Sequence, residues 1–197
     1  MSRLDFWFEF ASTYSYPAAM RIDDMARARG VEVEWRPFLL GPIFAEQGWR
    51  NSPFNIYPAR GRYMWRDLER ICAREGLAFA RPDPFPQNSL LAARVAMALA
   101  GPARARFARA VYAAEFGRGQ SIDRPDLVAA IARNEALPSE ILERASSDEV
   151  KAELKANVEE AKRLGIFGAP SFVTADGELF WGFDRLEAAL DWAAGRA

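Results

Sequence analysis

The pattern of hydrophobic and polar residues predicts that the chain begins with a strand, a helix and a second strand. Residues 4–10 alternate aromatic with acidic side chains, and residues 31–38 alternate apolar with charged ones. Between them, residues 17–29 place apolar side chains at helical spacing, and Gly30 ends that helix. This order is that of a βαβ unit.

The middle of the chain predicts a long loop and then a block of helices. Residues 41–62 are rich in Gly, Pro and Asn, and the segment is too long for a plain connection, which indicates a binding loop. Helical patterns separated by Gly and Pro follow, over residues 63–75, 89–100, 104–117 and 124–134, with a short one near 139–144. These helices predict an all-helical insertion.

The C-terminal part predicts a helix, two strands and a last helix. A cap at Ser147 and the acidic residues after it open a helix that runs to Leu164. Asp176 and Gly177 then give a hairpin signal between two strand patterns. The strands span residues 167–173 and 178–182, and the last helix spans 185–194.

Together these elements predict an α/β protein with a thioredoxin-like fold and an all-helical insertion domain, because their order is β-α-β, helices, α-β-β-α. Residues 1–40 and 146–197 would form the thioredoxin-like domain. Residues 41–145 would supply the binding loop and the helical insertion domain.

Composition and charge narrow the function classes. The 197 residues are 50% hydrophobic, which is enough for a well-buried globular domain, and the formal net charge of −1 gives no basic surface for nucleic acid. The first residues pass directly into a strand pattern without the features of a signal peptide, and no apolar run is long enough to span a membrane. We therefore expect a cytoplasmic protein that binds neither nucleic acid nor membranes.

Histidine is absent, and Cys72 is the only cysteine. Without His the chain lacks Ser-His-Asp and Cys-His catalysis, and a single Cys forms neither an intrachain disulfide nor a dithiol couple. The same counts leave no zinc site, so no metal is expected. Cys72 lies in the apolar row of a predicted helix, which favours a buried, unreactive thiol.

The turn after the first strand carries the strongest chemical signal. Ser12 lies where the strand passes into the helix, and the four positions from Ser12 to Ser15 are those at which a thioredoxin-like fold carries Cys-x-x-Cys. A hydroxyl there can donate to a thiolate, and the free N–H groups of a helix N-terminus favour negative charge. The site would therefore stabilise a sulfur anion supplied from outside. The alternative is a serine that only caps the helix.

Five segments carry a family resemblance. They are DFWFEFASTYSY at residues 5–16, NSP at 51–53, PARGRY at 58–63, FGAPSF at 167–172 and FWGFDRL at 180–186. In this order and spacing they resemble the 2-hydroxychromene-2-carboxylate isomerases, a DsbA-like family related to kappa-class glutathione transferases. The resemblance covers nearly the whole chain, and it departs from the family pattern at Thr13, where many members have proline.

The resemblance implies that glutathione is the cofactor. Ser12 is implied as the catalytic serine, which hydrogen-bonds the glutathione sulfur and holds it as a thiolate. Pro170 is implied as a cis-proline that leaves the backbone of Ala169 free to pair with the backbone of glutathione, and a trans turn proline is the alternative.

Four further residues are implied as glutathione contacts. Phe183 and Asp184 would hold the γ-glutamyl end, where the helix N-terminus takes the carboxylate and the Asp184 side chain takes the ammonium. An ordinary aspartate helix cap is the alternative. Asn51 and Arg60 would lie near the thiol and near a carboxylate of glutathione or of the substrate, and solvated loop residues are the alternative there.

The implied activity is a glutathione-dependent isomerisation in aromatic catabolism, between 2-hydroxychromene-2-carboxylate-type hemiketals and trans-o-hydroxybenzylidenepyruvate. The thiolate adds to a small aromatic substrate, a bond rotates, and the thiolate leaves. A kappa-class-like glutathione transferase or peroxidase is one alternative, and a redox-inactive thioredoxin-like binding protein is another. The resemblance also implies a homodimer, and the natural substrate stays open.

Aromatic residues are the candidates for the lining of a substrate pocket, although we expect most of them in the hydrophobic core. They are Trp7, Phe38, Phe44, Trp49, Phe54, Tyr63, Phe85 and Trp181.

Overall fold

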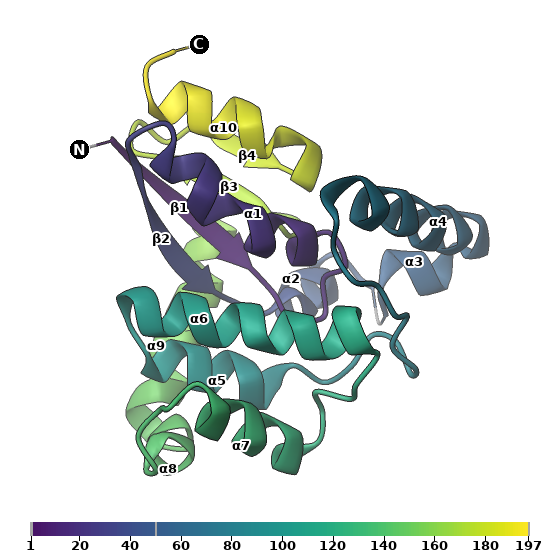
Figure 1. The fold of residues 1–197 in the computed structure, drawn as a ribbon, viewed down its shortest axis with the longest axis vertical. Coiled ribbons are helices and arrows are strands. Elements are labelled where there is room, and N and C mark those ends of the chain that lie inside the picture. Colours follow the sequence, from purple (N-terminus) through teal and green to yellow (C-terminus); the bar gives the residue numbers. More distant parts are fainter. Residues whose placement is uncertain (1, 50, 197) are drawn as a thin grey trace.

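The computed structural model describes residues 2–49 and 51–196 and contains a four-stranded sheet flanked by helices (Figure 1). The strands are β1 (Ser2–Phe8), β2 (Val31–Pro37), β3 (Ser171–Thr174) and β4 (Leu179–Trp181), in the order β2-β1-β3-β4. β1 pairs parallel with β2 and antiparallel with β3, and β3 pairs antiparallel with β4. The fold is therefore the α/β thioredoxin-like fold that the sequence predicts.

Helices fill the rest of the chain. α1 (Ser15–Arg27) joins β1 to β2, and α10 (Leu186–Ala193) follows β4 after a short 3₁₀ helix, η2 (Phe183–Arg185). Between β2 and β3 lie α2 (Leu40–Glu46), α3 (Pro53–Ile56), α4 (Pro58–Glu75), α5 (Leu90–Ala98), α6 (Gly101–Tyr112), the π-helix η1 (Ala113–Gly117), α7 (Pro125–Asn134), α8 (Ile141–Ala145) and α9 (Asp148–Arg163). The predicted division into two domains stays a prediction.

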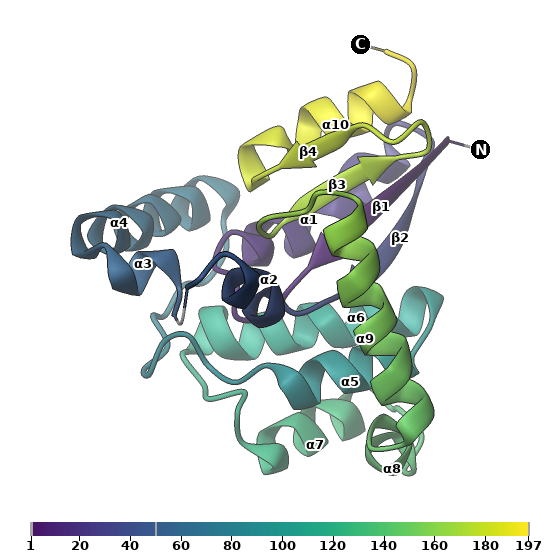
Figure 2. The same ribbon diagram turned by 180° about the vertical axis from the view of Figure 1, so that it is seen from behind.

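Alternate residues of β1 pack against different layers of helices, as the period of a strand requires. Leu4, Phe6 and Phe8 enter the main hydrophobic cluster, which includes side chains of α1, α6 and α10. Trp7 points to the other face and packs in a second cluster, with side chains of α2 and α9. Figure 2 shows α9 on that side, in front of the sheet in this view. The central strand is thus covered on both faces.

Three local signals are confirmed. Ser147 Oγ accepts a hydrogen bond from the Val150 N–H at 3.3 Å and caps α9. The Asp-Gly turn joins β3 to β4, where the Gly177 N–H donates to the Thr174 carbonyl at 2.9 Å. Cys72 is 1% exposed, and burial raises the pKa of its thiol to about 11, so it is a buried and unreactive thiol.

The predicted loop over residues 41–62 is wrong in its secondary structure. The segment contains α2 and α3, and α4 begins inside it at Pro58. Pro53 and Pro58 start helices here, because the first helical turn needs no N–H partner. The Ser52 hydroxyl also accepts from the Phe54 N–H at 3.3 Å and caps α3. The prolines that suggest a loop therefore mark helix starts.

Other boundaries also differ from the predicted ones, by two residues at β1 and α1 and by more at α6 and β3. α6 begins at Gly101 instead of residue 104, with Pro102 in its first turn, and the end of the predicted helix is the π-helix η1. β3 begins at Ser171 instead of residue 167, because the residues before it form a turn that contains the cis Ala169–Pro170 bond.

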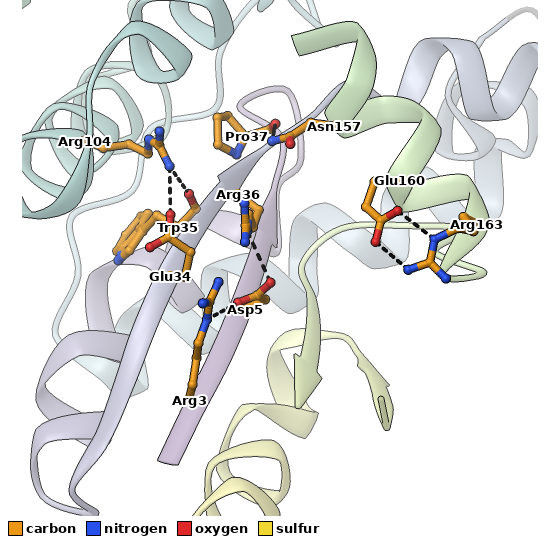
Figure 3. A network of polar contacts seen from close by, with 10 residues as sticks. All are labelled: Arg3, Asp5, Glu34, Trp35, Arg36, Pro37, Arg104, Asn157, Glu160 and Arg163. Atoms are coloured by element: carbon orange, nitrogen blue, oxygen red, sulfur yellow. Dashed lines mark hydrogen bonds and ion pairs between the residues drawn. The ribbon is translucent and has the colours of Figure 1, made fainter. Parts of the chain in front are cut away.

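Arg104 connects the helical block to the edge strand β2 (Figure 3). Its Nε donates at 2.9 Å to the carbonyl oxygens of Ala96 and Leu99 at the end of α5. Its Nη1 donates to the Trp35 carbonyl at 2.8 Å and to the Glu34 carboxylate at 3.0 Å. The side chain is 12% exposed. One buried cation thus satisfies carbonyl groups of a helix end and of a strand edge together.

No helix in the described ranges is long and apolar enough to cross a membrane. The same ranges contain no group of three or more His, Cys, Asp or Glu side chains that could hold a metal ion.

We predict that Gly61→Ala destabilises the protein. A Cβ at Gly61 would lie 2.3 Å from the carbonyl oxygen of Phe54, so α3 and α4 would have to move apart. The expected loss in the free energy of unfolding is about 1–3 kcal/mol, measured by urea denaturation. Gly41→Ala is the control, because its Cβ would meet nothing within 4 Å in α2. Equal stability of the two variants would contradict the close approach of α3 to α4.

Candidate active site

A cavity of about 1680 Å³ opens at the end of β1. Its wall comes from the turn after β1, the segment from α2 to α4, residues 85–90, the turn before β3 and residues 181–184. α2 lies beside the end of β1 (Figures 1 and 2). Segments from both ends of the chain therefore meet at one place.

Ser12 lies in the cavity wall, within the turn between β1 and α1. Its Oγ donates to the Ala169 carbonyl at 2.8 Å, and the side chain is nearly buried. The N-cap of α1 is Tyr14, whose side chain makes no capping bond, so the alternative of Ser12 as a helix cap is wrong. The hydroxyl rotates about one bond, so it can exchange the Ala169 carbonyl for a ligand atom.

The Ala169–Pro170 bond is cis, so the alternative of a trans turn proline is wrong. Ala169 lines the cavity opposite Ser12. Pro170 is buried behind it and is not part of the lining, and its carbonyl accepts from the Gly182 N–H at 2.9 Å. The turn before β3 is thus held to the turn after β4.

Phe183 and Asp184 lie in η2 and line the cavity. The Asp184 side chain is 75% exposed and lies 3.5 Å from the Arg185 guanidinium. Gly182 has φ 104°, and a Cβ there would lie 2.6 Å from Asp184 Oδ1. The N-caps of η2 and α10 are Gly182 and Arg185, so Asp184 is not the helix cap of the alternative interpretation.

Asn51 and Arg60 both line the cavity from the α2 to α4 segment. Asn51 Oδ1 accepts from the Ser52 N–H at 2.7 Å and from Asn55 Nδ2 at 3.2 Å. The Arg60 guanidinium lies 4.8 Å from the centre of the Tyr57 ring and is exposed. Apart from Pro170, every candidate site residue therefore borders the same cavity, while the ligand contacts of each remain a prediction.

The expectation that most of the aromatic candidates lie in the core is wrong. Trp7 and Phe38 are buried in the second hydrophobic cluster. The other six line the cavity, namely Phe44, Trp49, Phe54, Tyr63, Phe85 and Trp181. Five of them belong to the helices and turns between β2 and α5, and Trp181 is the last residue of the edge strand β4.

Sequence reasoning missed Glu9, a buried carboxyl group in the cavity wall. Its Oε1 accepts from the Ala11 N–H at 3.2 Å and from the Ser89 hydroxyl. Burial raises the pKa of Glu9 to about 7, although these two hydrogen bonds act in the opposite direction. The available signal was an acidic residue between Phe8 and Phe10, which the strand alternation explains equally well.

A second buried acid lies close to the first. Glu115 in η1 is fully buried, and neither carboxyl oxygen has a hydrogen-bond partner among the described residues. Burial and the charge of Glu9 raise its pKa well above the usual range. Two buried acids therefore lie close together, one in the cavity wall and one outside it.

Comparison with known proteins identifies the family. The family model described as "DSBA-like thioredoxin domain" matches residues 3–191. A 2-hydroxychromene-2-carboxylate isomerase from Sphingobium xenophagum is 28% identical over 186 residues, covering 93% of this chain and 94% of that protein. The glutathione S-transferase kappa 1 of Homo sapiens is 27% identical, covering 93% and 87%.

A solved structure shows the same fold. It is titled as a selenomethionine form of 2-hydroxychromene-2-carboxylate isomerase and superposes with a TM-score of 0.87 at 24% identity, covering 98% of this chain and 95% of that one. The relatives thus include an isomerase and kappa-class transferases.

We predict that Glu9→Gln stabilises the protein at neutral and higher pH. A carboxyl group whose pKa is higher in the folded state than in the unfolded state contributes fully to stability at pH values below its unfolded pKa of 4.5. This contribution is lost as the pH rises to about 7, the pKa in the folded state. The free energy of unfolding of the variant should exceed that of the parent protein by about 1–3 kcal/mol at pH 8 and equal it near pH 4. Denaturation at both pH values measures this. The control is Glu143→Gln, an exposed acid on α8, and an equal gain in both variants would contradict the prediction.

Proposed function

Because the chain belongs to the DsbA-like thioredoxin domain family, we propose that it is a glutathione-dependent isomerase. Its reaction would interconvert 2-hydroxychromene-2-carboxylate-type hemiketals and trans-o-hydroxybenzylidenepyruvate in aromatic catabolism. The observation that carries the proposal is the Ser12 hydroxyl, which borders the cavity at the turn where redox members of the fold carry cysteine. Cys72 is buried on α4, so the described chain offers no thiol of its own there.

The groups around the cavity fit the chemistry of glutathione. Ser12 offers a hydroxyl donor to the sulfur, and Arg60 offers a cation to a carboxylate. Asp184 offers an exposed carboxylate to the ammonium group. The turn that contains Ala169 offers main-chain atoms beside Ser12. Together, these charged and polar groups match a zwitterionic tripeptide with a thiol better than they match a neutral ligand.

The cavity also has room for a second, aromatic ligand. Its volume exceeds the roughly 300–1,000 Å³ that is usual for a single small ligand. Aromatic side chains such as Phe44, Trp49 and Phe85 supply the apolar part of the wall. A small aromatic substrate can therefore lie between this wall and the Ser12 turn.

When bound, glutathione would supply a nucleophilic thiolate that is recovered unchanged at the end of the reaction. Ser12 would donate a hydrogen bond to the sulfur and favour its anionic form. Asn51 would contribute a side-chain amide near the sulfur, and Phe183 would cover the γ-glutamyl end held by Asp184. The absence of histidine fits this division, since the nucleophile comes from glutathione and not from the chain.

A kappa-class-like glutathione transferase or peroxidase is the second candidate, because relatives with that name match at similar identity. It would use the same groups and release a conjugate or oxidised glutathione instead of free glutathione. The proposal includes a cytoplasmic location, where glutathione keeps thiols reduced, and the homodimer implied by the family resemblance. Product analysis after incubation with glutathione and the hemiketal distinguishes the two candidates.

We predict that Ser12→Ala lowers isomerase turnover by about tenfold or more, because the sulfur anion loses a hydrogen-bond donor. Turnover is measured from the absorbance change of the benzylidenepyruvate product. Ser171→Ala is the matched control, since its Oγ makes the same kind of bond, to the Gly168 carbonyl at 2.8 Å, outside the cavity. Full activity of Ser12→Ala, or an equal loss in Ser171→Ala, would refute the role of Ser12.

We predict that Asp184→Asn weakens glutathione binding about tenfold and leaves turnover at saturating glutathione nearly unchanged. The ammonium contact lies away from the sulfur, so its energy is the same in the ground state and the transition state. Because the Asp184 side chain is highly exposed, we expect the loss of binding free energy to lie at the lower end of the range for a charge-assisted hydrogen bond. Calorimetry measures the affinity, and Glu187→Gln on α10 is the control. Unchanged affinity would remove Asp184 from the site.

A further inference from the structure

Glu9 and Ser12 belong to one rigid turn at the inner wall of the cavity. The Ser12 N–H donates to the Glu9 carbonyl at 3.0 Å, and the Tyr112 hydroxyl donates to the same carbonyl at 2.9 Å. The Glu9 side chain is fixed as well, because Oε1 accepts from the Ala11 N–H and from the Ser89 hydroxyl. The carboxyl group therefore keeps a fixed position next to the turn that carries the Ser12 hydroxyl.

The second carboxyl oxygen of Glu9 is the one left for a ligand. Oε2 accepts no hydrogen bond from the described residues, but it is not fully enclosed by protein atoms. Both oxygens of Glu115 also lack a partner among these residues, and they are fully enclosed. The Glu9 side chain borders the cavity, and Glu115 does not. Glu9 thus has one oxygen anchored to the protein and one oxygen open to the cavity.

The groups that face Glu9 carry no positive charge. From the other elements packed around it come the Ser89 hydroxyl before α5, the Tyr112 hydroxyl of α6 and the Glu115 carboxyl of η1. No basic residue in the described ranges forms an ion pair with Glu9. Its pKa of about 7 follows from burial and allows it to exchange a proton near neutral pH in a chain without histidine.

We propose that Glu9 is the proton acceptor for the glutathione thiol, an inference that rests on the proposed function. Glu9 Oε2 takes the proton from the sulfur when glutathione binds beside Ser12. The S–H bond breaks, an O–H bond forms on Glu9, and the negative charge moves from the carboxylate to the sulfur. Glu9 returns the proton when glutathione leaves, so no oxidant, reductant or co-reactant is consumed.

The physical reason is that this part of the site stabilises one anion and not two. The Ser12 hydroxyl and the positive end of the α1 helix dipole can stabilise a single negative charge. A thiolate beside an ionised Glu9 would add a second buried anion with no cation next to it. Transfer of the proton to Glu9 keeps the local charge constant while glutathione binds.

The test counts protons released on binding. Glutathione is titrated into the protein at about pH 8 by calorimetry in buffers of different ionisation enthalpy, and thiolate formation is followed by ultraviolet absorbance. At this pH Glu9 is mostly ionised and the free thiol is mostly protonated. The parent protein should form the thiolate and release close to no proton. Glu9→Gln should release about one proton for each thiolate formed.

Two controls define the outcome. S-methylglutathione, which cannot ionise at sulfur, should give no difference between the parent protein and Glu9→Gln. Glu115→Gln, which removes a buried carboxyl outside the cavity, should behave as the parent does. Equal proton release per thiolate by the parent and by Glu9→Gln would overturn the inference and leave the proposed function standing. Absence of glutathione binding to the parent would overturn both.

An infrared measurement on the parent protein gives the same answer if Glu9→Gln fails to fold. Addition of glutathione at about pH 8 should produce the carbonyl stretch of a protonated carboxylic acid, and S-methylglutathione should not. Thiolate formation without that band would overturn the inference.

Discussion

The antiparallel pairing of β1 with β3 is the constraint on which the site depends. The register sets Trp7 opposite Ser171, so the turn that leaves β1 and the turn that enters β3 lie at the same end of the sheet. From there Ser12 reaches the Ala169 carbonyl, although the two residues are 157 positions apart in the chain. A shift of one residue in this register would turn the side chains of β3 to the other face and separate the two turns. The cavity follows from this pairing.

Several buried polar groups lie near this cavity. Ser15 Oγ at the start of α1, Gln87 Nε2 and both oxygens of Glu115 are enclosed without hydrogen-bond partners among the described residues. Each such atom costs stability, since desolvation is not offset by a partner. Glu115 also lies in a π-helix, a local form that is frequent at functional sites. The protein accepts this cost next to the groups to which we assign chemistry.

Local sequence signals were sufficient to predict most helices and strands. Features that depend on contacts between distant segments could not be predicted from them. The Ser147 cap and the Asp-Gly turn act within a few residues, so the sequence was sufficient for them. The prolines of residues 41–62 permit either a loop or a helix start, and only the packed structure decides between these. The Ser12 turn was visible as a motif, whereas Glu9 was missed because its burial and its Ser89 contact come from distant segments.

The central position of β1 also has a consequence for synthesis on the ribosome. β1 is made before its antiparallel partner β3, and every helix from α2 to α9 lies between them in sequence. The contacts within α3 and α4 are local and can form early, but the sheet cannot be completed until β3 has left the ribosome. An emerging chain therefore carries a βαβ unit with an open edge on β1. The Ser12–Ala169 contact can form only after residue 169 has left the ribosome.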